Sequence, residues 1–231
     1  MVSAVLLVHG ATPQTILKFH DTLSNQLPTL KGKWSFTFKV YRNNAYSIAP
    51  ELAVVQNVAP ENKFLYTWAP SYLHNSCITL INGCAAGVFS HVVQEELAEP
   101  HPFVISNAQL HHGATLGLND PWDTVLALRM QSLWTQRQQI KGDGGDIYEL
   151  ENGNLVIRTA NVSLHGNFRG LLIQLEVDHS KLAHTDPERI FRDLHAKYDI
   201  PLGNLCYKVV DPANYDEYAD LALQYAEILS F

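Results

Sequence analysis

Small polar residues followed by proline stand where the hydrophobic pattern changes to a period near 3.6 residues. These pairs are Thr12-Pro13, Asp120-Pro121, Asp186-Pro187 and Asp211-Pro212. The polar side chain can cap free amide groups, and proline fits the first helical turn. The apolar residues behind them are Ile16, Phe19, Leu23 and Leu27; Trp122, Leu126, Met130 and Leu133; Ile190, Leu194 and Tyr198; and Tyr215, Tyr218, Ala222, Tyr225 and Leu229. The sequence therefore predicts four surface helices, each with one buried face. On the exposed face of the last we place Asp216, Glu217, Asp220 and Glu227.

Between the helices, apolar and polar residues alternate with a period of two, which is typical of half-buried strands. We expect strands at Ala4 to His9, Trp34 to Arg42, Phe64 to Trp68, Cys77 to Ile81, Ala85 to His91, Phe103 to Ser106, Ile147 to Leu150, Leu155 to Val162, Phe168 to Val177 and Leu205 to Val210. Two Asn-Gly pairs, Asn82-Gly83 and Asn152-Gly153, are strong hairpin signals. The sheet is therefore predicted to be mainly antiparallel, in an α+β fold with a curved or closed sheet.

The chain has 231 residues, of which 46% are hydrophobic and 17% charged, and no Pro/Gly/Ser-rich linker divides it. We predict one folded domain, residues 1–231. A net charge of -7 argues against direct nucleic-acid binding, which needs a concentrated basic surface. Three cysteines without a C-x-x-C pair fit a reducing compartment. The longest apolar stretches fall short of a membrane-spanning helix, so we expect a soluble protein.

Four segments of the chain are distinctive: Ala4 to Val8 with Ala11-Thr12-Pro13, Leu133 to Asp143 (LWTQRQQIKGD), Phe168 to Glu176 (FRGLLIQLE) and Asp220 to Tyr225 (DLALQY). They resemble the Mediator subunit 20 family, a TATA-binding-protein-related factor family, and indicate a fungal member. Their order along the chain is that of the family. Residues 46–73 and 96–119 match the family pattern poorly.

The resemblance implies an antiparallel β-barrel, or strongly curved sheet, with about four flanking helices. It also implies a non-enzymatic nuclear subunit in the head module of Mediator, the coactivator of RNA polymerase II. The expected direct partner is Mediator subunit 18, whose fold is related. Through that partner the chain would join subunit 8 and face the polymerase and basal factors. No catalytic residue, metal or cofactor is carried over from the family.

A cysteine hydrolase is one enzymatic alternative, because His9-Gly10 follows an apolar strand and Cys84 lies among glycines. A nucleophile elbow needs the pattern G-x-S-x-G or its cysteine form. In Gly83-Cys84-Ala85-Ala86-Gly87 the first glycine adjoins the thiol, so the spacing is broken. A hairpin turn with a buried thiol is the simpler interpretation.

A metal-dependent tunnel-type phosphatase is the second alternative, because the family fold resembles the barrel of those enzymes. Glu149 and Glu151, placed on one strand face, could hold a divalent cation, and Glu176 with Asp178 gives another acidic pair. That chemistry also needs interior cations around the phosphates. We favour a solvated strand face for these carboxylates.

Two further patterns have ordinary structural interpretations. The glycine-rich Lys141 to Asp146 lacks the closing Gly-Lys-Ser/Thr of a phosphate-binding loop, so we expect a helix end followed by a hairpin. The histidines His101, His111 and His112 lie close in sequence but lack metal-ligand spacing, so we expect surface loops.

Trp134 and Arg137 are the candidate partner-interface residues, because tryptophan and arginine are typical interface anchors. We place both on the second helix, where Arg137 falls on the apolar stripe running towards Ile140. Its stem could also lie along the rim of the core with the guanidinium in water. The sequence leaves both interpretations open.

Overall fold

The computed structural model describes residues 2–44, 47, 63–81, 83, 85–91, 108, 120–178, 186–211, 213 and 216–231. The strands are β1 (Val2–His9), β2 (Thr29–Asn43), β3 (Phe64–Pro70), β4 (Ser76–Ile81), β5 (Ala85–Ser90), β6 (Trp134–Leu150), β7 (Leu155–Leu164), β8 (Asn167–Val177) and β9 (Asn204–Cys206). The helices are α1 (Pro13–Ser24), α4 (Trp122–Leu128), α5 (Pro187–Lys197) and α6 (Glu217–Ile228), with a 3-10 turn at Glu151–Gly153.

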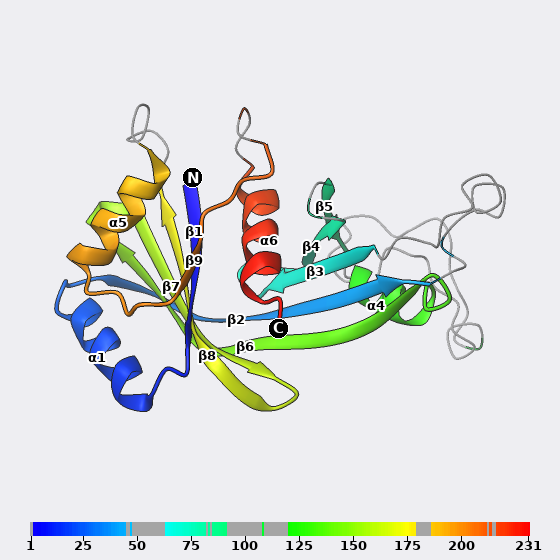
Figure 1. The fold of residues 1–231 in the computed structure, drawn as a ribbon, viewed down its shortest axis with the longest axis horizontal. Helices are drawn as coiled ribbons and strands as arrows, with labels where there is room; N and C mark the ends of the chain where they lie inside the picture. Colours follow the sequence, from blue (N-terminus) through cyan, green and yellow to red (C-terminus); the bar gives the residue numbers. More distant parts are fainter. Residues whose placement is uncertain are drawn as a thin grey trace.

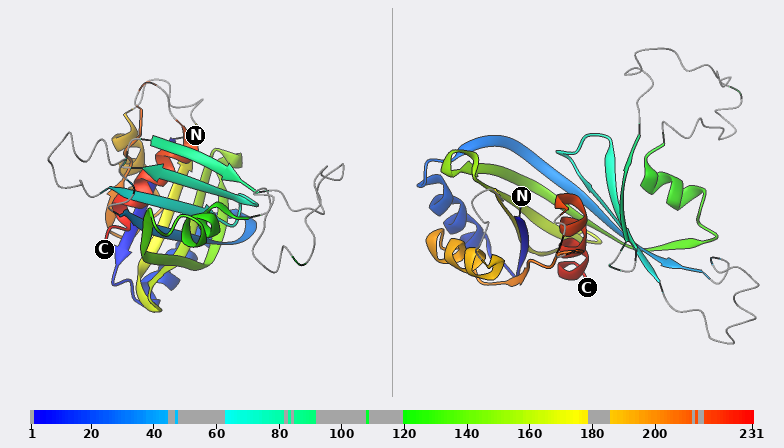
Figure 2. Two further views of the ribbon diagram at one scale, coloured as in Figure 1. Left: turned by 90° about the vertical axis from the view of Figure 1, so that its right-hand side faces the viewer. Right: turned by 90° about the horizontal axis from the view of Figure 1, so that it is seen from above.

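All nine described strands form one antiparallel sheet in the order β5-β4-β3-β2-β6-β7-β8-β1-β9. The sheet bends strongly around α6 (Figures 1 and 2). The strand order ends at β5 and β9, which do not pair in the described part of the chain. The prediction of a strongly curved, mainly antiparallel sheet with four helices is confirmed, whereas the sheet does not close into a barrel.

The helices cover both faces of the sheet. Helix α6 lies in the concave face, while α1, α5 and α4 pack on the outside, as the view from above shows (Figure 2). Strand β1 is buried on both faces, because Val5 and Leu7 contact the cluster under α6 while Leu6 and Val8 contact that under α1 and α5. The continuous apolar run of β1 is explained by this two-sided burial.

Two helix starts follow the capping prediction closely. Thr12 accepts a hydrogen bond from the amide of Thr15, and Asp186 accepts one from Glu188. The last helix does not begin at Asp211-Pro212 as predicted, but at Glu217. Asp216 is its cap and accepts hydrogen bonds from two amide groups of the first turn.

The second helix is shorter than predicted and ends at Leu128, so the predicted helix over Trp134 to Ile140 is wrong. That segment begins β6, which continues through the glycine-rich residues to Leu150. The expected hairpin at Lys141 to Asp146 is therefore also wrong, whereas the strand predicted at Ile147 to Leu150 is the end of the longer β6.

The glycines of β6 leave space for aromatic side chains from β2. A Cβ atom at Gly142 would overlap the ring of Phe36. One at Gly145 would overlap the indole of Trp34, which donates a hydrogen bond to the carbonyl of Thr159 at 2.8 Å. Glycine is thus required here by close packing within a strand rather than by a turn.

Helix α6 is buried over most of its surface. The prediction of an exposed acidic face is wrong at Asp220, whereas Asp216 and Glu227 are exposed and Glu217 is half-buried. Asp220 is only 3% exposed, and its carboxylate accepts a hydrogen bond from the amide of Val210 at 2.7 Å. Gln224 donates to the carbonyls of Ser3 and Lys208, both at 3.0 Å. These bonds pair the Asp220 carboxylate and the side-chain nitrogen of Gln224 in the interior.

Two smaller expectations are wrong, and a third lies outside the described residues. Leu27 lies beyond α1 and is exposed, rather than on a buried stripe. The strand predicted at Leu205 to Val210 is limited to Asn204–Cys206. The strand predicted at Phe103 to Ser106 lies outside the described residues. Among the described helices, none has the length and apolarity needed to cross a membrane.

Candidate partner interface

Apolar side chains remain exposed on the three strands at the β5 end of the sheet. They are Phe64 on β3, Ile81 on β4, and Val88 and Phe89 on β5. Val88 pairs with Ile78, which packs under α6, so Val88 lies on the concave face and is 51% exposed. Phe89 lies on the other face, where its ring stacks on Trp122 with centroids 4.3 Å apart. Strand β5 therefore presents apolar surface on both faces, which favours contact with another protein.

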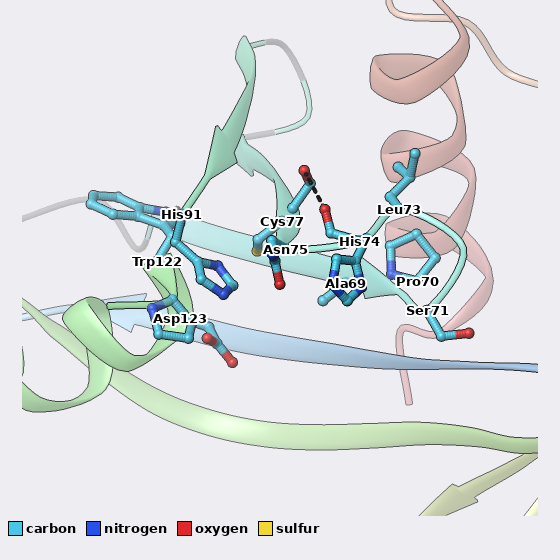
Figure 3. Close-up of a pocket in the computed structure, with 12 residues that line it drawn as sticks. Ala69, Pro70, Ser71, Leu73, His74, Asn75, Cys77, His91, Trp122 and Asp123 are labelled. Atoms are coloured by element: carbon cyan, nitrogen blue, oxygen red, sulfur yellow. Dashed lines mark hydrogen bonds between the residues drawn. The ribbon is translucent and has the colours of Figure 1, made fainter. Parts of the chain in front are cut away.

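A pocket of about 320 Å³ lies behind β5, between the β3–β4 turn and the start of α4 (Figure 3). His74, His91 and Asp123 line it, and Asp123 forms an ion pair with Lys39. Burial, with the charge of Asp123, raises the pKa of the Cys77 thiol to about 12. The thiol therefore stays protonated and unreactive at neutral pH. Among the described residues, no group of three or more His, Cys, Asp or Glu is placed to hold a metal ion.

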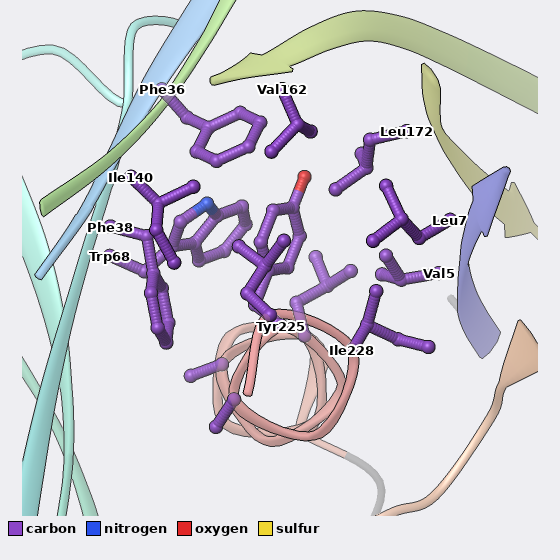
Figure 4. Close-up of a cluster of buried hydrophobic side chains, with 14 of the residues drawn as sticks. Val5, Leu7, Phe36, Phe38, Trp68, Ile140, Val162, Leu172, Tyr225 and Ile228 are labelled. Carbon is purple, nitrogen blue, oxygen red and sulfur yellow. The ribbon is translucent and has the colours of Figure 1, made fainter. Parts of the chain in front are cut away.

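The concave face of the sheet is filled by α6 rather than open to substrate (Figure 4). Tyr225 is fully buried, and its ring lies 4.6 Å from that of Trp68 and 5.0 Å from that of Phe36, measured between centroids. Leu7 and Ile228 belong to the same cluster. The centre of the fold is thus a packed core.

A polar cluster borders this core and joins β7, β8, α6 and the turn after β3. Tyr225 donates a hydrogen bond to Gln174 at 2.7 Å, and the Gln174 amide donates to the hydroxyl of Tyr72 at 3.2 Å. Gln174 also donates to Glu176, which forms an ion pair with Arg158. The guanidinium of Arg158 lies 4.2 Å from the centroid of the Tyr72 ring. The cluster therefore satisfies its charges internally.

The ionisation of this cluster follows from its burial and its close pairing. Burial opposes the charged form of Arg158, but its hydrogen bond to Glu176 and that carboxylate's charge raise its pKa overall. Burial, and then the charge of Glu176, raises the pKa of Tyr72. Glu176 is only 2% exposed, so the prediction of a solvated face for Glu176 and Asp178 is wrong at Glu176.

Glu149 and Glu151 do not share a strand face, because β6 ends between them. Glu149 pairs with Lys31 at 3.1 Å. Glu151, in the turn after β6, pairs with Lys197 at 2.5 Å and accepts a hydrogen bond from Tyr198 at 2.8 Å. The structure therefore does not bring these two carboxylates together as a metal-binding pair.

The other residues of the enzymatic alternatives are separated or lie outside the described part. Cys84, His101, His111 and His112 are not among the described residues. His9 is exposed at the end of β1, where its ring packs edge-on against Phe231 with centroids 6.2 Å apart. Strands β4 and β5 pair antiparallel from Ile81 and Ala85 onward, as expected for a hairpin, while Asn82 lies outside the described residues.

Trp134 and Arg137 lie on β6 rather than on a helix, and the structure does not bring them together. Trp134 is partly buried against Leu126, in the cluster under α4. Arg137 is exposed at a bulge and lines a separate groove. Of the two, Arg137 is therefore the residue whose side chain is exposed to a partner.

The apolar surface of β5 was missed by the sequence reasoning, although the sequence contains a signal for it. Val88 and Phe89 are consecutive, so a strand must place them on opposite faces. A two-sided apolar strand is ordinary in the middle of a sheet but costly at an edge. The missing information was the position of β5 at the edge.

Comparison with known proteins gives a consistent family assignment. Residues 1–230 match the family described as "TATA-binding related factor (TRF) of subunit 20 of Mediator complex". Mediator of RNA polymerase II transcription subunit 20 of Debaryomyces hansenii is 57% identical over 236 residues, covering 100% of both chains. The subunit of the same name in Scheffersomyces stipitis is 56% identical, and that of Saccharomyces cerevisiae is 28% identical over 231 residues and 98% of each chain.

Solved structures are more distant. The PH1012 protein of Pyrococcus horikoshii has a TM-score of 0.44 and 11% identity, covering 90% of this chain and 96% of its own. A Hippeastrum protein titled as a putative adenylyl cyclase with a dominant triphosphatase activity has a TM-score of 0.40 and 13% identity, covering 92% and 93%. Neither likeness is close enough to bear on function. The match over almost the whole length and the high identity to the yeast proteins show that this chain belongs to the Mediator subunit 20 family.

Proposed function

We propose that this chain is a non-catalytic subunit of the Mediator head module that pairs directly with Mediator subunit 18. Through subunit 18 it joins subunit 8, and in the nucleus it helps couple regulators and basal factors to RNA polymerase II. Family membership supports the place in Mediator. The whole chain, residues 1–231, acts as one domain in this proposal.

The observation that carries the proposal is the exposed apolar surface at the β5 end of the sheet. Ile81, Val88 and Phe89 lie on adjacent strands and stay between about a third and a half exposed. A permanent complex buries such surface and has a more apolar interface than a transient one. The filled concave face supports a role in binding rather than catalysis, because an active site requires an accessible cavity.

Coexpression with subunit 18 of the same organism, followed by gel filtration at moderate salt, tests the pairing. We expect the two wild-type chains to elute together. Val88→Lys places a charge on the concave face of the exposed β5 edge and should separate them. Leu17→Lys is the matched control, because Leu17 is exposed on α1, outside the β3–β5 surface.

The outcomes separate the pairing from its location. Separate elution of the wild-type chains would contradict the pairing itself. Coelution of the Val88→Lys variant, with the same stability as the control, would place the contact elsewhere. A charge in the centre of an apolar interface should weaken binding at least about tenfold, since a hot spot contributes about 2 kcal/mol or more.

A further inference from the structure

A polar groove lies on the convex face of the sheet, where β6 and β7 run side by side. It leads to the β7–β8 hairpin, which projects at the bottom of Figure 1, and its volume is about 440 Å³. Six of the residues that line it are Gln136, Arg137, Gln139, Lys141, Ser163 and His165. None of its lining residues is acidic, although the whole chain has a net charge of -7. The groove is thus a locally positive surface on a chain whose net charge is negative.

The two permanent cations of the groove differ from most others in the chain. Eight lysines and arginines elsewhere pair with carboxylates. Within the described residues, neither Arg137 nor Lys141 has a carboxylate at ion-pairing distance. Asp143 is exposed two residues beyond Lys141 on the same strand, and no ion pair joins the two within that same part of the chain. The positive charge of Arg137 and Lys141 is therefore left for a ligand.

The backbone sets the distance between the points at which the two cationic side chains are attached. Val40 of β2 pairs with Gln138, while Tyr41 pairs with Gln136, so Arg137 is the extra residue of a β-bulge. Lys141 pairs with Ser163 in the regular ladder beyond it. Four residues of strand span about 13 Å at 3.3 Å per residue, and the bulge shortens this. Two cations at this spacing suit a ligand that carries more than one negative charge.

Neutral hydrogen-bond donors lie between and beside the cations. The amide groups of Gln136 and Gln139 and the hydroxyl of Ser163 line the same groove. His165, at the start of the hairpin turn, has a positive φ of 51° and adds a ring nitrogen donor. Carboxylate and backbone carbonyl oxygens would both find donors here.

We propose that this groove binds an acidic segment of a partner protein, with carboxylates reaching Arg137 and Lys141. A protein segment fits better than nucleic acid, because nucleic-acid binding uses many phosphate contacts and the groove has two permanent cations. The proposal is independent of the pairing with subunit 18, because Val88 and the β5 surface do not line the groove.

Fluorescence anisotropy on the full 231-residue chain tests the proposal, with a labelled peptide in which glutamate alternates with serine. We expect binding at low salt that weakens as salt is added. A peptide with glutamine in place of glutamate should not bind. The double variant R137Q/K141Q should bind at least about fivefold more weakly, since each exposed ion pair contributes modestly.

The matched control is the double variant Lys63→Gln/Arg189→Gln, which removes the same charge from two exposed sites outside the groove. It should bind like the wild type, and R137K/K141R should largely retain binding. Equal weakening by the groove and control variants would show that only net charge matters and would overturn the proposal. So would equal binding of the glutamine peptide, or of single-stranded oligothymidylate of the same charge. Because both groove cations are exposed, thermal melting of R137Q/K141Q should match that of the wild type.

Discussion

Removing Arg158 should destabilise the protein strongly, because it leaves the buried carboxylate of Glu176 without its cation. Glu176 is 2% exposed and, among the described residues, would keep the neutral amide of Gln174 as its hydrogen-bond donor. Breaking a buried ion pair by removing one partner costs about 3–5 kcal/mol. For a chain of this size, each kcal/mol lowers the melting temperature by about 2–4 °C, so Arg158→Leu should lower it by about 6–20 °C.

The matched control is Arg192→Leu, which removes an arginine from an exposed i,i+4 ion pair with Glu188. An exposed pair of this kind contributes about 0.5 kcal/mol or less. A second test is Arg158→Leu/Glu176→Leu, because replacing both members of a buried pair with apolar residues is often neutral or stabilising. The double variant should therefore be more stable than Arg158→Leu alone.

Urea unfolding followed by far-UV circular dichroism gives the free energies for these variants and their controls. The reasoning would be refuted if Arg158→Leu cost no more than Arg192→Leu. It would also be refuted if Arg158→Leu/Glu176→Leu lost as much stability as Arg158→Leu and Glu176→Leu lose when their separate losses are added. Either result would mean that Glu176 reaches water or another partner in solution.

Two further predictions concern the packing of β6 and the burial of α6. Gly142→Ala should cost about 1–3 kcal/mol by overpacking against Phe36, and Phe36→Leu should recover part of this loss in the same unfolding assay. Burial raises the pKa of Asp220, so the folded protein holds this proton more tightly than the unfolded chain and stability falls as pH rises through that range. Asp220→Asn keeps an acceptor for the amide of Val210 but does not titrate. Its melting temperature should therefore vary less with pH between the ordinary carboxyl range and neutrality. A melting profile of Asp220→Asn as steep as that of the wild type would contradict this.

The predictions that depended on local chemistry succeeded where a local signal decides the structure. The caps at Thr12 and Asp186 start their helices as predicted, because each polar side chain bonds to amides of its own first turn. The alternation from Trp34 to Val40 correctly predicted β2, with Trp34, Phe36 and Phe38 facing the core. In both cases the partner atoms lie close along the chain or follow a simple period.

The predictions failed where the reason for a residue lies on another strand. The glycines of Lys141 to Asp146 resemble a turn in sequence, yet Gly142 and Gly145 are needed by Phe36 and Trp34. No local pattern contains that information, because the contact joins residues more than 100 positions apart. The helix predicted over Trp134 to Ile140 failed similarly, since pairing with β2 fixes this segment as a strand.

The candidate site was predictable only in part. Arg137 was selected because its charge interrupted an apolar helical stripe, and the structure shows no helix there. Its exposure instead results from the bulge in β6, which depends on how β2 pairs with it. Trp134 was predicted as an interface anchor beside Arg137, and the structure packs it partly against Leu126 of the same chain.

The burial of α6 connects the fold to the proposed role. With Tyr225 and Ile228 filling the concave face, the strand face that a tunnel enzyme would leave open is occupied by the chain's own helix. The backbone groups of Ser3, Lys208 and Val210 bond to Asp220 and Gln224 in the interior. The helix is therefore held by contacts from both ends of the chain. What remains accessible on the sheet is its outer face and both faces of its β5 edge. Its apolar edge at β5 and its cationic groove on β6 and β7 differ in chemistry, so one subunit could hold a permanent partner at the first while an acidic segment exchanges at the second.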